Sequence, residues 1–239
     1  MFLLDLTLPT PAENLALDEA LLEQAELVGG PRELLRIWEP ASPMVVIGRS
    51  SRVAEEVDLE ACRRLGIPVL RRCSGGAAIV AGPGCLMYAV VLSYELRPEL
   101  RWIDRAHRCV LDTMSAAIAP AVPLIQHRGT SDLAIGGLKV SGNSVRCRRR
   151  HILYHGTLLY AFALDTIGEC LRMPPRQPDY RGGRTHREFV ANIPLAGSEL
   201  RRAVIGAWNA GQPLEDWPRE TTARLVAERY GRESWHRER

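Results

Sequence analysis

Apolar residues recur along this chain with two spacings, one typical of helices and one typical of strands. Behind the pair Thr10-Pro11, the helical spacing predicts an amphipathic helix. Runs rich in β-branched residues, bounded by turn-forming letters such as "PASP", predict strands. The predicted helices cover residues 11–27, 58–66 and 101–119, and the predicted strands cover 33–39, 44–49, 67–72 and 85–94.

Three more strand-like segments follow in direct succession, over residues 131–137, 138–146 and 151–162, and the turn "CRRRH" joins the last two. Consecutive strands with short connections favour antiparallel pairing, and the helices would cover the faces of that sheet. The predicted fold class is therefore mixed α/β (α+β), with a central mixed, largely antiparallel sheet flanked by helices.

The end of the chain has a different pattern. Two amphipathic helices are predicted near 198–208 and 219–230. We therefore expect a main domain over 1–192 and a small helical C-terminal appendage over 193–239.

The composition is that of an ordinary globular protein. The 239 residues are 46% apolar and 25% charged, and the formal net charge is +3, which is too small to indicate nucleic-acid binding. No run of about 18 apolar residues predicts a membrane span, and the N-terminus does not have the pattern of a signal peptide. We expect a cytoplasmic protein with neither nucleic acid nor a membrane as partner.

The cysteines show no spacing typical of a metal site, so no residue is assigned as a metal ligand. Free thiols in a reducing compartment are the simplest expectation. The six positions are Cys62, Cys73, Cys85, Cys109, Cys147 and Cys170.

Lysine is used only once in this sequence. Of 31 basic residues, only Lys139 is not arginine, and it lies in the stretch "IGGLKVSGNS". An ammonium is a compact point charge with a tunable pKa, which a planar guanidinium cannot replace. Lys139 is therefore the first candidate for catalysis, and the alternative is a surface lysine in an arginine-biased composition.

A glycine pair follows two arginines in the stretch "RRCSGG". Gly75 and Gly76 allow the backbone to approach a ligand, and their N–H groups can donate to an anion. Arg71 and Arg72 alternate across a strand, so only one of them can point inward with the loop. The alternative is an ordinary tight turn.

Polar residues also repeat at strand spacing. Lys139 and Ser141 are two apart, as are His155 and Thr157, so a regular pleat would gather all four on one sheet face. The alternative is a hairpin with a solvated face. A Ser-His-Asp triad cannot be assigned from spacing, and the phosphate-binding motifs GxxxxGK[ST] and GxGxxG do not occur. The basic turn 146–151 is either a solvated hairpin tip or a docking patch for an acidic partner.

Taken in order, these segments resemble the lipoate-protein ligase A family, within the biotin/lipoate ligase and octanoyltransferase superfamily. The matching stretches are "NLALDEALL", "LRIWEP", "PMVVIGRSSRVAEEVD", "RRCSGGAAIV", "GTSDL", "GGLKVSGNS" and "HGTLL". The resemblance implies a biotin/lipoate-protein ligase-like catalytic domain that holds an acyl-adenylate in a bent pocket.

The same resemblance implies a role for each matching residue. Lys139 would be the essential lysine, placed against the carboxylate and the α-phosphate. The residues implied to bind the acyl-adenylate are Arg72, Ser74, Gly75, Gly76, Ala77, Asp132, Ser141, Gly142, His155, Gly156 and Thr157.

The implied reaction has two steps. Lipoate attacks the α-phosphate of ATP, with Mg²⁺ assisting the departure of pyrophosphate, and the mixed anhydride then acylates a lysine of a carrier-domain acceptor protein. The resemblance also allows for a separate accessory polypeptide. Fixed cations and N–H donors suit both steps, because each moves negative charge onto oxygen atoms.

Two other functions stay open at this point. An octanoyltransferase of the same fold would take its acyl chain from acyl carrier protein through a cysteine thioester, with Cys73, Cys85 or Cys170 as the nucleophile. A non-catalytic lipoyl-binding protein is the second alternative, because Ala81 and Gly82 replace a His-Asp pair of the family.

Overall fold

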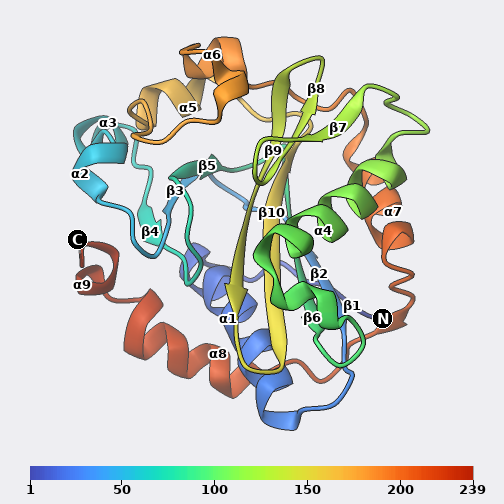
Figure 1. Ribbon diagram of the computed structural model, residues 1–239. Coiled ribbons are helices and arrows are strands. Elements are labelled where there is room, and N and C mark those ends of the chain that lie inside the picture. The colour runs from blue at the N-terminus through green and yellow to red at the C-terminus, as the bar shows by residue number, and fades with distance from the viewer. Residues whose placement is uncertain (239) are drawn as a thin grey trace.

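Two β-sheets form the frame of the protein, seen here in a computed structural model that describes residues 1–238 (Figure 1). The large sheet has the order β11-β1-β2-β6-β10-β9-β8-β7, and the small sheet has the order β4-β3-β5. In the large sheet β1 pairs in parallel with β2 and β11, while the pairs from β2 to β7 are antiparallel. The predicted class, a mixed and largely antiparallel sheet with flanking helices, is confirmed.

The strands are β1 Phe2–Asp5, β2 Leu34–Trp38, β3 Met44–Ile47, β4 Val69–Arg71, β5 Ile79–Ala81, β6 Cys85–Ser93, β7 Ile125–Arg128, β8 Asp132–Ile135, β9 Leu138–Cys147, β10 His151–Leu159 and β11 Gln212–Pro213. The α-helices are α1 Pro11–Val28, α2 Val53–Glu56, α3 Leu59–Arg64, α4 Ile103–Ile118, α5 Asp165–Cys170, α6 His186–Phe189, α7 Gly197–Ala207, α8 Arg219–Leu225 and α9 Glu233–His236. Short 3-10 turns lie at Pro98–Arg101 and Asp179–Arg181, and a π-helical turn lies at Val226–Tyr230.

The first helix begins where the sequence predicts. Thr10 and Glu13 form a capping box, and Pro11 occupies the first turn, where its missing N–H costs nothing. The expectation of an amphipathic helix fails, however, because α8 and the π-helical turn cover the outer side of α1. Its polar residues Asp18 and Glu19 are therefore buried with the apolar ones.

Helices pack on both faces of the large sheet. Val90 of β6 lies in one apolar cluster with Val110 of α4 and Val204 of α7. Val91, the next residue, points to the opposite face and lies in a cluster with Leu21 of α1. This alternation along one buried strand places α4 and α7 on one face and α1 on the other.

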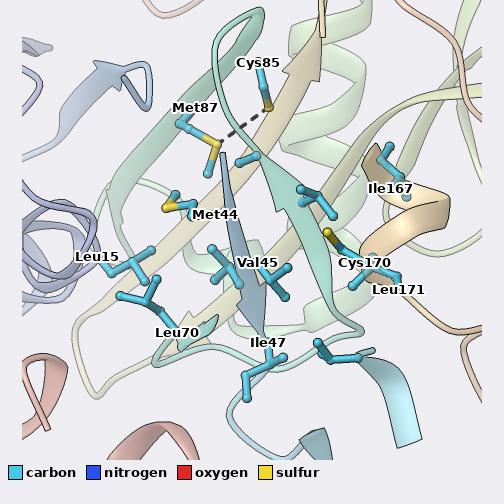
Figure 2. Packing of buried hydrophobic residues seen from close by; sticks show 14 of the residues in the cluster. Leu15, Met44, Val45, Ile47, Leu70, Cys85, Met87, Ile167, Cys170 and Leu171 are labelled. Carbon is cyan, nitrogen blue, oxygen red and sulfur yellow. Dashed lines mark hydrogen bonds between the residues drawn. The ribbon is translucent and has the colours of Figure 1, made fainter. Parts of the chain in front are cut away.

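The small sheet extends the layer formed by α1. Figure 2 shows Met44 and Val45 of β3 within one cluster that includes Met87 of the large sheet and Ile167 and Leu171 near α5. The sulfur atoms of Met87 and Cys85 are 3.9 Å apart in this cluster. The two sheets therefore share an apolar core, and the candidate site lies at its edge.

The end of the chain is packed against the main body. Leu200 and Trp208 are buried in the cluster beneath α4, and β11 adds a strand to the large sheet beside β1. Tyr230 is fully buried against α1, where its hydroxyl donates to Glu19 at 2.6 Å. The division at residue 192 stays a prediction, although these contacts join the two parts closely.

Two sequence-based expectations about the whole chain can be compared with the structure. All six cysteines are free thiols, as predicted. Across residues 1–238, none of the helices combines the length and the apolar composition that a bilayer crossing requires.

Candidate active site

The loop at residues 72–77 follows β4 and is shaped by its own arginine. Arg72 Nε donates to Ser74 Oγ at 3.1 Å, and the terminal nitrogens donate to the carbonyls of Val46 and Ala77, each at 3.1 Å. Burial lowers the pKa of Arg72 to about 10, while the neighbouring Cys73 and Glu56 oppose that shift. Arg72 thus lines the large cavity but directs much of its guanidinium back into the loop.

Arg71 points away from this loop, as the alternation along the strand predicts. Its guanidinium donates to the carbonyls of Gly48 and Ser51, each at 2.8 Å, and its Nε donates to the carbonyl of Trp235 at 3.1 Å. Arg71 is fully buried. It therefore fixes the base of the loop from the opposite side.

Close backbone contacts hold the glycines of the loop. A Cβ atom at Gly48 would lie 1.9 Å from the carbonyl oxygen of Gly76, and Gly76 itself has a φ of +87°. The Gly75 carbonyl accepts a hydrogen bond from Ser144 Oγ of β9 at 2.8 Å. Glycine is required at 48 and 76 for two different reasons, close approach and left-handed backbone.

Lys139 lies across from this loop, with its ammonium group in the cavity. Its Nζ is 2.7 Å from Asp132 Oδ1, and the hydroxyl of Tyr180 donates to Asp132 Oδ2 at 2.8 Å. The aliphatic end of the Lys139 side chain lies over Gly142, where a Cβ atom would be 3.0 Å from Cε. The carboxylate of Asp132 and the absence of a side chain at Gly142 together fix where the ammonium of Lys139 can lie.

A β-bulge decides which residues share a face with Lys139. The pairing of β8 with β9 shifts by one residue after Lys139, so that Ser141 lies opposite Leu133. Ser141 Oγ then accepts a hydrogen bond from Asn143 at 3.0 Å instead of joining the lysine. The expectation that Lys139 and Ser141 share a face is wrong, because the pleat is not regular there.

His155 belongs to a chain of buried polar groups. Its Nε2 is 2.6 Å from Ser74 Oγ, and its Nδ1 is 3.2 Å from Asp18 Oδ2. Asp18 Oδ1 lies 2.6 Å from a guanidinium nitrogen of Arg36, which is itself fully buried. These contacts connect α1, β2 and β10 to the loop at residues 72–77.

A cavity of about 810 Å³ lies between these groups. Apolar residues of four elements form one wall, namely Leu15, Val46, Ile79 and Met87. Polar and charged residues form the other side, including Ser50, Ser51, Thr130, Ser131, Asp132 and Lys139. A smaller cavity of about 130 Å³ adjoins it and shares Lys139, Gly142 and Thr157.

The structure brings most of the predicted site residues to these cavities. Those that line one or both of them are Arg72, Gly76, Ala77, Asp132, Lys139, Ser141, Gly142, His155, Gly156 and Thr157. Ser74 is 1% exposed and contributes through its hydrogen bonds, whereas Gly75 is exposed on the loop.

Several residues of the site were not predicted from the sequence, among them Asp18, Glu56 and Tyr180. Asp18 sits among leucines in "NLALDEALL", and a charge in a buried apolar run is the signal that could have marked it. Glu56 accepts a hydrogen bond from the backbone N–H of Ala78 at 2.6 Å. Tyr180 reaches Asp132 from a turn-rich segment, where no periodic pattern predicts a contact.

The replaced family positions lie in the apolar core. Ala81 is fully buried in the cluster that joins the two sheets. A Cβ atom at Gly82 would lie 3.1 Å from Pro43 Cα and 3.2 Å from Phe162 Cε2. Neighbouring apolar residues therefore fill the space that a larger residue at 82 would need.

Comparison with known families assigns this architecture. The family model described as the lipoyl protein ligase A/B catalytic domain matches residues 10–203. A protein of Aeropyrum pernix, provisionally named lipoate-protein ligase A, is 33% identical over 87% of this chain and 74% of its own length. The chain belongs to the lipoyl protein ligase A/B catalytic domain family. A second relative, the octanoyltransferase LipM of Carboxydothermus hydrogenoformans, is 26% identical over 94% of this chain and 93% of its own length.

Solved structures show the same fold at low sequence identity. A protein of Thermoplasma acidophilum with bound lipoic acid superposes with a TM-score of 0.80 at 21% identity, over 100% of this chain and 99% of its own. A bipartite lipoate protein ligase of the same organism, described with its E2 lipoyl domain, gives 0.79 at 24%, over 99% and 95%. A lipoate-protein ligase A bound with ATP gives 0.78 at 24%, over 99% and 98%.

Proposed function

We propose that this chain is a lipoate-protein ligase, which activates lipoate with ATP and transfers the lipoyl group to a lysine of an acceptor protein. The placement of Lys139 carries the proposal. Its ammonium lies 2.7 Å from Asp132, where the large cavity meets the small one. A fixed positive charge there suits a reaction in which a carboxylate attacks a phosphate and a carbonyl is later attacked by an amine.

The polar side of the large cavity suits the nucleotide and the mixed anhydride. Gly75, Gly76 and Ala77 form the turn across from Lys139, and backbone N–H groups in such a turn can donate to phosphate oxygens. Gly142 and Gly156 leave room for neighbouring side chains of the site, because a Cβ atom at 142 would meet the end of Lys139 and one at 156 would lie 1.7 Å from Asn143 Oδ1. The lipoate protein ligase A bound with ATP supports this assignment by similarity of fold.

The apolar wall suits the acyl chain. Leu15, Val46 and Met87 line the cavity together with His155 and Thr157. A saturated chain placed there would be removed from water, which stabilises it by roughly 0.8 kcal/mol for each buried CH₂ group. The Thermoplasma acidophilum protein with bound lipoic acid has the same fold and supports this placement.

Carboxylates at the cavity fit the expected Mg²⁺. Glu55 and Glu56 of α2 line the polar side, and within residues 1–238 no cluster of three or more acidic, histidine or cysteine residues forms a complete metal site. Mg²⁺ is commonly held by one or two carboxylates together with substrate phosphates and water. We expect Glu55 and Glu56 to hold it, and the ion would neutralise charge on the departing pyrophosphate.

The acceptor in this proposal is a carrier domain with an exposed lysine, and an accessory polypeptide remains part of it. The Thermoplasma ligase that is described as bipartite, together with its E2 lipoyl domain, supports both partners. We propose that the reaction takes place in the cytoplasm, and the six free thiols support a reducing compartment.

The central experiment weighs an acceptor domain by mass spectrometry after incubation with this protein, lipoate and Mg-ATP. We expect the mass of one lipoyl group on the acceptor. The variant Lys139→Arg keeps the charge but misplaces it, and its rate should fall by about 10²- to 10³-fold. Arg187→Lys is the matched control, because it exchanges the same two side chains at an exposed ion pair with Asp165. Normal turnover by Lys139→Arg would remove Lys139 from the mechanism.

A parallel incubation with octanoyl carrier protein and no ATP tests the transferase alternative. That reaction needs an activated thiolate, whereas burial raises the pKa of Cys73, Cys85 and Cys170 to about 12 in each case. We therefore expect no hydroxylamine-sensitive adduct on this chain. Such an adduct would favour the transferase, and lipoate binding without pyrophosphate release would favour a non-catalytic binding protein.

A further inference from the structure

The buried chain of polar groups around His155 has the residue types of a hydrolase triad, but its geometry suits another role. Ser74, His155 and Asp18 follow one another at 2.6 Å and 3.2 Å. A nucleophilic serine must meet its substrate, yet Ser74 is 1% exposed and Arg72 Nε donates to its oxygen at 3.1 Å. This series of hydrogen-bonded polar groups therefore ends inside the loop at residues 72–77, where it can influence the conformation of that loop.

The hydrogen bonds fix where the protons lie. Because Arg72 donates to Ser74 Oγ, the serine hydroxyl is free to donate to His155 Nε2. The proton of a neutral imidazole then lies on Nδ1, which faces the carboxylate of Asp18. With this tautomer, the hydroxyl of Ser74 and the Nδ1–H of His155 each meet an acceptor.

Asp18 is itself held in place from a second direction. Its other oxygen lies 2.6 Å from Arg36, whose guanidinium also donates to the backbone carbonyl and the side-chain oxygen of Asn14, each at 2.7 Å. Burial lowers the pKa of Arg36, while Asp18 opposes that shift. The carboxylate therefore has a fixed position and cannot turn to follow the histidine.

We propose that Asp18 is a positioning residue for the ligase reaction, which acts through His155 and Ser74 to hold the anion-binding loop in shape. Asp18 selects the tautomer of His155 that carries its proton on Nδ1. In that tautomer Nε2 accepts a hydrogen bond from the hydroxyl of Ser74. Ser74 Oγ in turn accepts a hydrogen bond from Arg72. The guanidinium of Arg72 also donates to the carbonyl of Ala77, at the other end of the loop. This inference rests on the proposed function, because the loop is the part that would face the acyl-adenylate.

The variant Asp18→Asn tests the tautomer directly. An amide can donate to His155 Nδ1, which would move the ring proton to Nε2. Nitrogen-15 NMR of the imidazole rings reads this change without any substrate, and a His155→Gln sample identifies the signal. We expect a protonated Nδ1 and a bare Nε2 in the natural protein, and the reverse in Asp18→Asn. A natural protein with the proton on Nε2 would overturn the proposal.

Kinetics then separate positioning from general damage to the fold. Asp18→Asn and Ser74→Ala should each lower kcat for pyrophosphate release by about 10- to 100-fold, the range for partners that orient a functional side chain, with a smaller effect on KM for ATP. Because both act through His155, the double variant should lose no more than the worse single variant. Losses that multiply would show independent sites and contradict the proposal.

Ser74→Ala and one further variant keep the experiment decisive. Ser74→Ala leaves the pair of Asp18 and Arg36 intact, so it tests the same chain of contacts even where Asp18→Asn unfolds. Glu23→Gln is the matched control, since it neutralises a carboxylate of the same helix that pairs with Arg224 at the surface. We expect its kcat to be unchanged.

The NMR readout also separates this inference from the proposed function. If the natural protein lacks ligase activity but shows the Nδ1 tautomer, the proposed function fails, while the proposed hydrogen bonds among Asp18, His155 and Ser74 are confirmed. If the natural protein is an active ligase with the other tautomer, the positioning role of Asp18 fails alone.

Discussion

At the scale of single residues, Gly142 decides where the ammonium of Lys139 can lie. A Cβ atom at 142 would be 3.0 Å from Lys139 Cε and 3.1 Å from Nζ, which are the far atoms of a flexible side chain. We expect Gly142→Ala to keep its stability, because the lysine can move. Pyrophosphate release should fall by about tenfold or more, since a shifted charge loses about 1.4 kcal/mol or more of transition-state stabilisation.

The control for this change is Gly168→Ala. Gly168 lies within α5, its Cβ position has nothing within 4 Å, and alanine favours a helix over glycine. This variant should keep full activity and unfold at an equal or higher urea concentration. Unchanged pyrophosphate release by Gly142→Ala would show that the position of the ammonium tolerates a shift.

Residue identity alone predicted the lysine but not its whole environment. Lys139 was selected because it is the single lysine of the sequence, and it does line the cavity. Ser141 was assigned to the same face by strand spacing, which a one-residue bulge invalidates. Asp18 could not be assigned, because its partners Arg36 and His155 are distant in sequence and meet only in the folded protein.

At the scale of elements, the C-terminal segment contacts the strand that leads into the loop. His236 Nδ1 accepts the backbone N–H of Arg71 at 3.0 Å, and its Nε2 donates to the Tyr230 carbonyl at 3.0 Å. Burial lowers the pKa of His236 below the usual 6.5, the Arg71 charge acts in the same direction, and the Tyr230 carbonyl and Glu233 oppose it. Only the neutral ring can accept at Nδ1, whereas the donation from Nε2 persists in either charge state, so protonation removes the bond from Arg71.

The lowered pKa of His236 makes the stability of the protein depend on pH in a defined direction. Because the pKa is lower in the folded than in the unfolded protein, the unfolded protein binds the proton first as the pH falls. The stabilisation is complete above about pH 6.5 and is lost as the pH falls through the folded pKa. We expect the difference in unfolding free energy between the natural protein and His236→Gln to shrink from about pH 7.5 to about pH 5.5.

Urea denaturation of both proteins at the two pH values measures this difference. His107 and His186 also have pKa values lowered by burial, but they are common to both proteins and cancel. A difference that stays constant with pH would show that the ring at 236 does not change its charge in this range.

Periodicity predicted the long elements and some short ones, such as α3 and β3, but it missed other short elements. The predicted helix over 101–119 has regular apolar spacing along its length, and the helix over 11–27 is marked by its Thr10-Pro11 start although its polar residues are also buried. The three-residue strand β5 is hidden in "CSGGAAIVAGPG", where glycines indicate turns, and its place depends on pairing with β3. The predicted helix over 219–230 changes to a π-helical turn at Val226, which the sequence pattern does not indicate.

At the scale of the whole molecule, the cavity exists because two sheets meet at an apolar edge. Met87 of β6 pairs with Trp38 on one side and Thr157 on the other, and its side chain lies in the cluster that joins the small sheet. It also lines the large cavity. A residue at this position can therefore change the acyl wall without touching the loop or Lys139.

Met87→Trp should separate the two halves of the proposed substrate. The larger ring would fill part of the apolar wall, so we expect KM for lipoate to rise by about tenfold or more while ATP binding stays unchanged. The added volume should also cost about 1–3 kcal/mol of stability, so binding is measured well below the unfolding temperature by calorimetry. Met87→Leu conserves volume and should bind both substrates normally. Unchanged lipoate binding in a folded Met87→Trp would place the acyl chain elsewhere, because the larger ring would then fill space that the chain does not use.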